Sequence, residues 1–336
     1  MASRRALILG GTGQIGLATA RRLLAAGWDV DVAGRDPTKL PADLAGRGVR
    51  FLAADRRDAV VLAAALGDGA DLLVDCICFT AADAELLLPL ARAATSTAML
   101  SSKAVYVDDR GNHSNSAEPP RYDGPIRETQ ATLAPGGGDY MTGEGYGPNK
   151  VAAERVLLDS GLPVSVLRPS KVHGIGSSNP REWVFVKRVL DRRPAVFLSH
   201  RGEGVEHTTA AANVASLIET IAAKPGNRVL NSADPVAPTV LEIARTVAAH
   251  LGHEWEEILV EDDSLGRTPW DAPHPIVLDT SAALALGYEP AGDYAATVVA
   301  ELDWLVGDPA ARPADDEEFF ARYLDYAAED ARLRTA

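Results

Sequence analysis

The sequence predicts an α/β fold, built as a doubly wound parallel sheet with a smaller C-terminal α/β domain. Three observations predict it. Short apolar runs alternate with helical patterns through the first half of the chain. These runs are apolar at consecutive positions, as expected for parallel strands that helices cover on both faces. The second half shows a more mixed pattern of strand and helix signals, which indicates a smaller unit.

The elements of the first half follow from hydrophobic periodicity. Helices and strands alternate there, and one further helix and strand resume after a long irregular segment. The expected strands are those at residues 6–9, 30–33, 49–53, 72–78, 98–100 and 164–167. The expected helices are those at residues 15–26, 58–66, 82–94 and 146–160.

The later elements carry weaker signals. Thr239 and Glu242 have the spacing of a capping box, which predicts a helix through His250. The last expected helix is amphipathic, and its aromatic stripe is expected to pack on its own subunit. The elements expected after His250 are one strand and two helices, at residues 255–260, 293–306 and 318–326.

We divide the chain into three parts. Residues 1–170 form the sheet domain, and residues 171–306 form mainly the smaller domain, with some segments returning to the sheet. Residues 307–336 form an acidic helical tail. Within the first part, residues 107–145 break the strand–helix rhythm with many prolines and glycines. A loop of that length is functional or mobile, so a substrate lid and a plain surface insertion both stay open.

Composition excludes several classes of function. The chain has 336 residues and a formal net charge of −14, which disfavours binding to nucleic acid or to an anionic membrane. It shows no leader pattern and no apolar run long enough to span a bilayer. Cys76 and Cys78, two apart in one predicted strand, are expected to be core residues, with neither a disulfide nor a metal site. We expect a cytoplasmic protein with a small-molecule substrate, and leave a homodimer open.

Residues 5–16 carry the most specific motif. An apolar strand ends in Gly10, Gly13 and Gly16, and an amphipathic helix follows. Glycines at this spacing let the backbone turn sharply and approach a pyrophosphate, while the helix N-terminus offers free N–H groups to the anion. The motif predicts a Rossmann-type dinucleotide site.

Tyr146 and Lys150 form the second motif. They are four residues apart, so on a helix the phenol and the ammonium share one face. A neighbouring cation favours the phenolate, which makes a tyrosine a usable base. Pro148 is compatible with this helix if it lies in the first turn. Ser102 follows a predicted strand at its carboxyl end, where a doubly wound sheet binds ligands.

These motifs together resemble the extended short-chain dehydrogenase/reductase family, the NAD-dependent epimerase/dehydratase group. The likeness covers residues 5–306. Gly10-Gly11-Thr12-Gly13-Gln14-Ile15-Gly16 is similar to the cofactor turn, and Ala54-Asp55-Arg56-Arg57-Asp58 to the segment that meets adenine. Ser101-Ser102-Lys103-Ala104-Val105-Tyr106 resembles the family's serine segment. Leu167-Arg168-Pro169-Ser170-Lys171-Val172-His173-Gly174 is similar to the segment that closes over the nicotinamide.

The resemblance implies roles for individual residues. Tyr146 is the general acid/base, Lys150 stabilises the phenolate and holds the nicotinamide ribose, and Ser102 positions the reacting oxygen. A nicotinamide cofactor carries the hydride. The expected cofactor-binding residues are Gly10, Thr12, Gly13, Gln14, Ile15, Gly16, Arg35, Asp55, Arg56, Cys76, Tyr146, Lys150 and Pro169. The expected substrate residues are Lys103, Lys171, His173 and His207.

The end of the second strand bears on the choice of cofactor. Arg35 stands where a guanidinium accommodates the 2′-phosphate of NADP, and this favours NADP over NAD. The adjacent Asp36 keeps NAD possible, because an acidic residue there binds the ribose 2′-hydroxyl. Glu206 stands where sugar-nucleotide relatives tend to place a phosphate-binding arginine, and Arg201 is a possible substitute.

Three hypotheses about function follow. The first is an NADP-dependent oxidoreductase acting on a small carbonyl or alcohol, because the Glu206 carboxylate disfavours a diphosphate. The second is a nucleotide-sugar epimerase or dehydratase with tightly bound NAD(P). The third is a non-catalytic NADP sensor or an RNA-binding relative, against which Ser102, Tyr146, Lys150 and the net charge argue.

Overall fold

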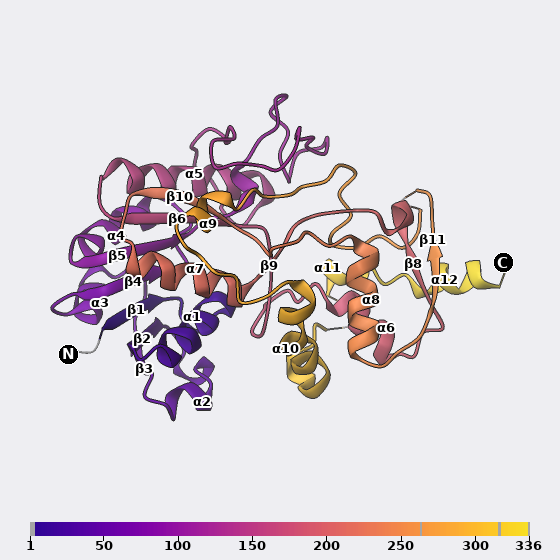
Figure 1. Cartoon of the computed structure of the whole chain (residues 1–336), viewed down its shortest axis with the longest axis horizontal. Helices are drawn as coiled ribbons and strands as arrows, with labels where there is room; N and C mark the ends of the chain where they lie inside the picture. The colour runs from indigo at the N-terminus through magenta and orange to yellow at the C-terminus, as the bar shows by residue number, and fades with distance from the viewer. Residues whose placement is uncertain (1–3, 263, 315–316, 335–336) are drawn as a thin grey trace.

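A seven-stranded parallel sheet organises the molecule. The computed structural model describes residues 4–262, 264–314 and 317–334, so the ends of the predicted first part and tail lie partly outside it. The strand order is β10-β6-β5-β4-β1-β2-β3. From β1, the chain first adds strands on one side (β2, β3) and then on the other (β4, β5, β6), as in a Rossmann sheet. Helices cover both faces, and a second, helix-rich part lies beside the sheet (Figure 1). The predicted fold class is confirmed.

The strands are short and in register at their carboxyl ends. Leu9 of β1 is paired with Ala33 of β2 on one side and with Asp75 of β4 on the other. The residues that follow these strands therefore meet at one edge. The strands of the sheet are β1 (Arg5–Leu9), β2 (Asp29–Gly34), β3 (Arg50–Ala53), β4 (Ala70–Asp75), β5 (Ala94–Leu100), β6 (Val164–Pro169) and β10 (Arg228–Ser232).

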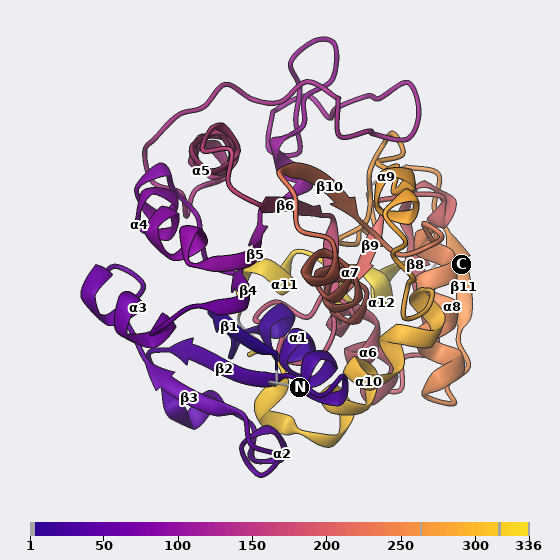
Figure 2. The same ribbon diagram turned by 60° about the vertical axis from the view of Figure 1, so that its left-hand side comes forward.

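Alternation along β1 explains why the strands are apolar throughout. Ala6 and Ile8 enter the core beneath α1 (Gln14–Ala25) and α7 (Ala211–Ala223), whereas Leu7 and Leu9 enter the core on the opposite face. Both faces need apolar side chains because both are buried. Figure 2 shows the helices of the second face together. They are α3 (Ala59–Leu66), α4 (Ala81–Arg92) and α5 (Gly143–Asp159).

The second part has its own core, in which Trp183, Phe185 and Trp270 are buried. Two small parallel pairs, β7 with β9 and β8 with β11, support it. Its strands are β7 (Lys171–His173), β8 (Ala195–Leu198), β9 (Thr208–Ala210) and β11 (Glu256–Leu259). Its helices are α6 (Trp183–Leu190), α8 (Val240–His250), α10 (Tyr294–Gly307), α11 (Glu318–Ala321) and α12 (Tyr326–Leu333).

Several short elements complete the chain. After β6, three elements return to the large sheet: α7, β10 and α9 (Ser281–Ala285), which packs against β10. None of the helices in the described ranges combines the length and apolar character that crossing a membrane requires. The remaining short helices are α2 (Ala42–Ala45) and the 3₁₀ turns η1 (Pro37–Lys39), η2 (Lys103–Val105), η3 (Ser199–Gly202) and η4 (Pro309–Ala311).

Two boundaries differ from the expectation. β4 ends at Asp75, so Cys76 and Cys78 follow the strand and line the turn after it. The Thr142 hydroxyl accepts from the backbone N–H of Gly145 (3.0 Å), and this cap starts α5 at Gly143. Pro148 therefore lies inside the helix, and the expectation of a first-turn proline is wrong.

The C-terminal aromatic segment also differs. It was expected to form one helix, but it forms α11 and then the start of α12. The Asp325 carboxylate caps α12 by accepting from the backbone N–H of Ala328 (3.0 Å), and this local bond starts a second helix. Phe320 is buried, and Phe319 and Tyr323 pack with it against the C-terminal core, as expected for packing on the same subunit.

The long irregular segment 107–145 is held by specific contacts. The Asp108 carboxylate accepts from the backbone N–H groups of Arg110, Asn112 and Arg121 at 2.8–3.0 Å. Further along, the N–H of Ile126 donates to the carbonyl of Val277 (2.8 Å). The segment runs above α5 and β10 at the top of the molecule (Figure 1).

A buried ion pair fastens α5 to the sheet. Glu154 of α5 accepts from both Nε (3.0 Å) and Nη2 (2.5 Å) of Arg168 on β6, and the hydroxyl of Ser101 donates to the same carboxylate. Glu154 and Arg168 are 2% and 5% exposed. A buried charge that loses its partner is costly, so this pair constrains where α5 lies.

We expect Glu154→Ala to lower the free energy of unfolding by about 3–5 kcal/mol, because it leaves the Arg168 guanidinium buried without its carboxylate. Urea unfolding of the purified protein measures this. Arg155→Ala, at an exposed position of the same helix, is the matched control and should stay within about 0.5 kcal/mol of the parent. Equal stabilities of the two variants would contradict the assigned role of the pair.

Candidate active site

The glycine turn between β1 and α1 has the conformation that its sequence predicts. Gly10 has φ +71°, in the left-handed region that favours glycine. A Cβ on Gly16 would lie 2.5 Å from the Cα of Gly11, so only glycine lets the helix approach the turn. Gly13 is the N-cap of α1. A cavity of about 530 Å³ opens above the turn and is lined by Gly10, Thr12 and Gly13.

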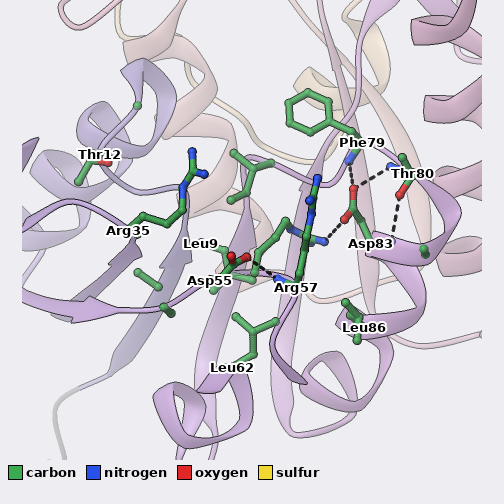
Figure 3. A pocket seen from close by; sticks show the side chains of 18 of the residues that line it. Leu9, Thr12, Arg35, Asp55, Arg57, Leu62, Phe79, Thr80, Asp83 and Leu86 are labelled. Atoms are coloured by element: carbon green, nitrogen blue, oxygen red, sulfur yellow. Dashed lines mark hydrogen bonds and ion pairs between the residues drawn. The ribbon is translucent and has the colours of Figure 1, made fainter. Parts of the chain in front are cut away.

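Arg35 and Asp36 differ in their access to this cavity. Arg35 lines it, and Figure 3 shows Arg35 on one side with Thr80 and Asp83 on the other. The Asp36 carboxylate instead accepts from the backbone N–H (2.9 Å) and the hydroxyl (2.6 Å) of Thr38. These bonds cap η1 and lower the pKa of Asp36. Asp36 does not line the cavity.

The segment after β3 contributes three charged residues. Asp55 lines the cavity and accepts from the backbone N–H of Arg57 (2.9 Å). Arg56 lies between two carboxylates, pairing with Asp75 and with Asp83 (2.7 Å). Its charge is compensated within the protein, whereas Arg57 lines the same cavity with no recorded ion pair among the described residues.

Aromatic side chains at the cavity were not predicted. Phe79 and Tyr140 stack with ring centroids 5.0 Å apart, and both line the cavity. Phe79 is held by its backbone N–H, which donates to Asp83 (2.9 Å; Figure 3). Tyr140 comes from the irregular segment 107–145. No local pattern in the sequence brings these two rings together.

Lys150 is buried and fixed at the carboxyl edge of the sheet. Its ammonium donates to the carbonyls of Cys78 (2.7 Å) and Leu100 (2.8 Å) and lies 4.3 Å from the centroid of the Phe79 ring. The ring of Tyr146 is 5.8 Å from the same ammonium. The structure thus brings the predicted pair together, and Lys150 keeps one N–H for a ligand.

Ser102 stands at the end of β5 beside this pair. Its hydroxyl accepts from the backbone N–H of Ala104 (3.1 Å), so it caps η2. Ser102 and Tyr146 both line a cavity of about 290 Å³, called the smaller cavity below, and a second one of about 500 Å³, called the larger cavity. Both names are distinct from the first cavity, which lies at the glycine turn. The two residues therefore mark the junction between these spaces.

The smaller cavity collects the remaining cofactor candidates. Gln14, Ile15, Cys76 and Pro169 line it together with Lys150. The Gln14 amide donates to the carbonyl of Gly174 (3.0 Å), which ties the start of α1 to the chain after β7. Three of the four predicted segments, namely the glycine turn, the serine segment and the Arg-Pro segment, contribute to this space.

The larger cavity contains a charge cluster in which Lys103 and Glu206 are buried and Lys171 is half-buried. Glu206 pairs with Lys103 and with Lys171 (3.0 Å), and all three residues line the cavity. Burial alone would raise the pKa of Glu206, but the two ammonium groups hold it at about 2. Burial lowers the pKa of Lys171 to about 8, although Glu206 acts in the opposite direction.

This pairing corrects the argument drawn from Glu206. The carboxylate is not free to repel an anion, because two lysines compensate it. Arg181 and Arg267 also line the cavity, opposed there by Asp271. Sequence reasoning missed both arginines, which lie in irregular chain without a motif. Arg201, the possible substitute, is about half exposed and pairs with Glu261 (2.8 Å).

Two predicted substrate residues do not reach the cavities. His207 is buried with both ring nitrogens bonded, Nε2 to the carbonyl of Asp234 (2.8 Å) and Nδ1 to the N–H of Leu278 (3.1 Å). His173 is buried with its Nε2 on the Asp234 carboxylate (3.0 Å). Neither histidine lines any of these three cavities.

Comparison with known proteins decides the family. The model of the NAD dependent epimerase/dehydratase family matches residues 6–231. The chain belongs to this family. Comparison with curated proteins finds no match. The predicted family is confirmed, and the chain is an enzyme with a Rossmann-type fold.

Solved structures support the fold at low sequence identity. The UDP-glucose 4-epimerase of Stenotrophomonas maltophila, solved with NAD and a formylated UDP-arabinopyranose, has a TM-score of 0.69 and 19% identity, covering 90% of this chain and 99% of that one. The UDP-glucose 4-epimerase of Bifidobacterium longum, in complex with NAD⁺ and UDP, has a TM-score of 0.68 and 18% identity, covering 91% of this chain and 99% of that one. The dTDP-glucose 4,6-dehydratase of Bacillus anthracis str. Ames, in complex with NAD, has a TM-score of 0.67 and 15% identity, covering 92% of this chain and 99% of that one.

We expect Glu206→Gln to bind sulfate about tenfold more tightly at pH 6, a change of ~1.4 kcal/mol, because the larger cavity loses a carboxylate at a pH well below the parent Lys171 pKa of about 8. Calorimetry measures this in the presence of excess NAD and, separately, of excess NADP, either of which would compete with sulfate at the glycine-turn cavity. Glu261→Gln, which removes an exposed carboxylate, is the control. Unchanged or weaker sulfate binding by folded Glu206→Gln would show that this carboxylate does not set the charge of the cavity.

Proposed function

We propose that this enzyme transfers hydride between a nicotinamide cofactor and a hydroxyl- or carbonyl-bearing carbon of an anionic substrate, in an epimerase- or dehydratase-type cycle. The observation that carries the proposal is the position of Tyr146 and Ser102. They line both the smaller cavity, which Lys150 also lines, and the larger cavity, whose lining is rich in cations. A reacting carbon held there touches the acid/base on one side and the cofactor space on the other.

The residues present fit a dinucleotide. Gly10, Thr12 and Gly13 of the glycine turn line the first cavity, and Gly13 is the N-cap of α1, so the N-terminus of that helix lies at the cavity. Lys150 retains one donor beside the smaller cavity. When bound, the nicotinamide supplies the hydride chemistry. Gly10, Gly13 and Arg35 would hold the phosphates and ribose, and Lys150 the nicotinamide ribose.

Each residue of the site then has a role. The Tyr146 phenol transfers the proton of the reacting hydroxyl, and the Lys150 cation favours its phenolate form. The Ser102 hydroxyl donates to the reacting oxygen as charge develops there. The backbone N–H of Ala104 points to the other side of that hydroxyl (3.1 Å) and fixes its orientation.

The lining of the larger cavity supports a phosphate-bearing substrate. Lys103, Lys171, Arg181 and Arg267 outnumber the carboxylates of Glu206 and Asp271 among its described residues. Ser114, Asn115 and Pro119 of segment 107–145 form another part of its wall. The structural neighbours named above carry UDP or are named for dTDP-glucose, so nucleotide-diphosphate sugars are the first compounds to try.

One observation favours a second candidate, an NADP-dependent reductase. Arg35 and Arg57 line the first cavity, and the only acid that sequence reasoning offered for a ribose 2′-hydroxyl, Asp36, caps η1 instead. A guanidinium at this place suits a 2′-phosphate. The two candidates differ in outcome, because a reductase consumes NADPH and an epimerase or dehydratase regenerates its cofactor.

We expect Arg35→Ala to weaken NADPH binding by about 1.5–3 kcal/mol and to leave NADH binding nearly unchanged, because only NADPH offers a 2′-phosphate to the guanidinium. Calorimetry with each cofactor measures both constants. Arg47→Ala removes an exposed arginine that does not line the cavity and serves as the control. Equal losses for NADH and NADPH would remove Arg35 as the selecting residue.

The reaction itself is tested with UDP-, GDP- and dTDP-sugars and, separately, with small carbonyl compounds plus NADPH. We expect mass spectrometry to show conversion of a sugar nucleotide, while the NAD(P)H absorbance shows no net change. Tyr146→Phe should lower turnover by at least ~100-fold, the contribution of a positioned acid/base, with cofactor affinity retained. Tyr323→Phe, in the C-terminal segment, is the control.

The outcomes separate the candidates. Stoichiometric NADPH consumption with a carbonyl compound, and none of the sugar nucleotides converted, would replace the epimerase/dehydratase proposal by the reductase. Near-parent turnover of Tyr146→Phe on any substrate would overturn the assignment of the acid/base in both.

A further inference from the structure

Three buried side chains that the proposed reaction does not use lie together in the second part of the molecule. They are His173 at the end of β7, Glu182 just before α6, and Glu301 on α10. One ring nitrogen and one oxygen from each carboxylate lie within 4.8 Å of one another. The three residues are 2%, 1% and 0% exposed. None of them lines the three cavities described above.

The orientation of His173 is set by Asp234. The Nε2 of His173 lies 3.0 Å from the Asp234 carboxylate, which also accepts from the Thr208 hydroxyl (2.7 Å) and the backbone N–H of Ala210 (2.7 Å). Because an ionised carboxylate only accepts, the proton of a neutral ring lies on Nε2. The lone pair is then on Nδ1, which is buried and has no hydrogen-bond partner.

Glu301 and Glu182 each keep coordinating capacity. The Oε2 of Glu301 accepts from the backbone N–H of Gly174 (2.5 Å), while its Oε1 is buried without a partner. Glu182 accepts from the hydroxyl of Tyr294 (3.3 Å). Within the described residues no ion pair is recorded for either carboxylate. Two buried carboxylates side by side are costly unless a cation or a proton compensates them.

We propose that His173 Nδ1, Glu182 and Glu301 bind a divalent transition-metal ion of the Zn²⁺ class. A histidine that donates its other nitrogen to a carboxylate is the recurrent arrangement of a metal-binding imidazole. One imidazole with two carboxylates suits Zn²⁺ and its neighbours, whereas Mg²⁺ and Ca²⁺ prefer oxygen ligands throughout. Sequence reasoning missed this site, because Glu301 lies far along the chain from His173 and Glu182 and the three residues share no motif.

Charge supports a divalent ion at this place. Asp234, Glu182 and Glu301 bring three negative charges when ionised. Without a cation, burial and the neighbouring Glu182 raise the pKa of Glu301 well above its usual range, although Arg181 acts in the opposite direction. A dication closes this balance. The ion would join β7, the start of α6 and α10, and two neighbours of its ligands, Lys171 of β7 and Arg181 beside Glu182, line the larger cavity. Its role is therefore to position the wall of that cavity, and the inference does not depend on the proposed reaction.

The test is metal content and stability of the whole chain. Protein is unfolded in EDTA, refolded with Zn²⁺ alone or with EDTA, and desalted. We expect one equivalent of zinc by elemental analysis and a higher melting temperature in the Zn²⁺ sample. Refolding with Co²⁺ should give the visible absorption bands of a bound nitrogen–oxygen site. Mg²⁺ should give neither retention nor stabilisation.

Variants show where the ion binds. Glu301→Gln keeps the shape of the side chain and should lose the equivalent of zinc and the shift in melting temperature. Asp234→Asn should weaken zinc affinity by about 10–100-fold, as loss of a supporting carboxylate does. His250→Gln, at a histidine paired with Asp303 on the surface, should keep both readouts. It controls for binding by exposed histidines.

Two results would overturn the proposal. One is retention of the same zinc equivalent by Glu301→Gln, which would place the ion elsewhere. The other is parent protein that retains no zinc after refolding and shows the same melting temperature with and without Zn²⁺.

Discussion

The buried ammonium of Lys150 is the interaction on which the site depends. It donates to the carbonyls of Cys78 and Leu100, so it fixes α5 against the ends of β4 and β5. Tyr146 lies one turn before it and Glu154 one turn after it, on the same helix face. Glu154 is bound in turn by Arg168 of β6. With both later turns fastened to the sheet, the Tyr146 side chain has to lie at the carboxyl edge.

Charge is distributed unevenly over this protein, and positive charge gathers at the candidate site. The chain carries −14 in total, yet the larger cavity is lined by more cations than carboxylates. A cation-lined recess in an acidic protein concentrates the attraction for an anion at one place. Glu206 is part of this arrangement, because a single carboxylate between Lys103 and Lys171 offsets the repulsion between the two ammonium groups at the cavity wall.

The sequence was informative wherever the signal is local. Gly10, Gly13 and Gly16, the Tyr146–Lys150 spacing and the apolar runs of the strands depend on neighbours within a few residues, and they predicted the sheet, the turn and the shared helix face. Long-range contacts were not readable. The sign of the influence of Glu206 depends on Lys103, about a hundred positions away, and the stacking of Phe79 on Tyr140 joins α4's entry loop to segment 107–145. Even α5 began earlier than expected, since Thr142 rather than Pro148 determined its start.

Gly174 connects the two halves of the molecule through its own backbone. Its carbonyl accepts from Gln14, at the start of the helix that faces the cofactor cavity, and its N–H donates to Glu301 of α10. Its φ of +134° and a gap of 3.2 Å between an added Cβ and the Ala211 side chain leave little room for another residue. The Glu301 carboxylate is therefore linked to the Gln14 amide through the backbone of one residue, from the N–H of Gly174 to its carbonyl. The carboxylate cluster of the second part is thus connected by hydrogen bonds to the start of α1, although none of its side chains lines the three cavities described above.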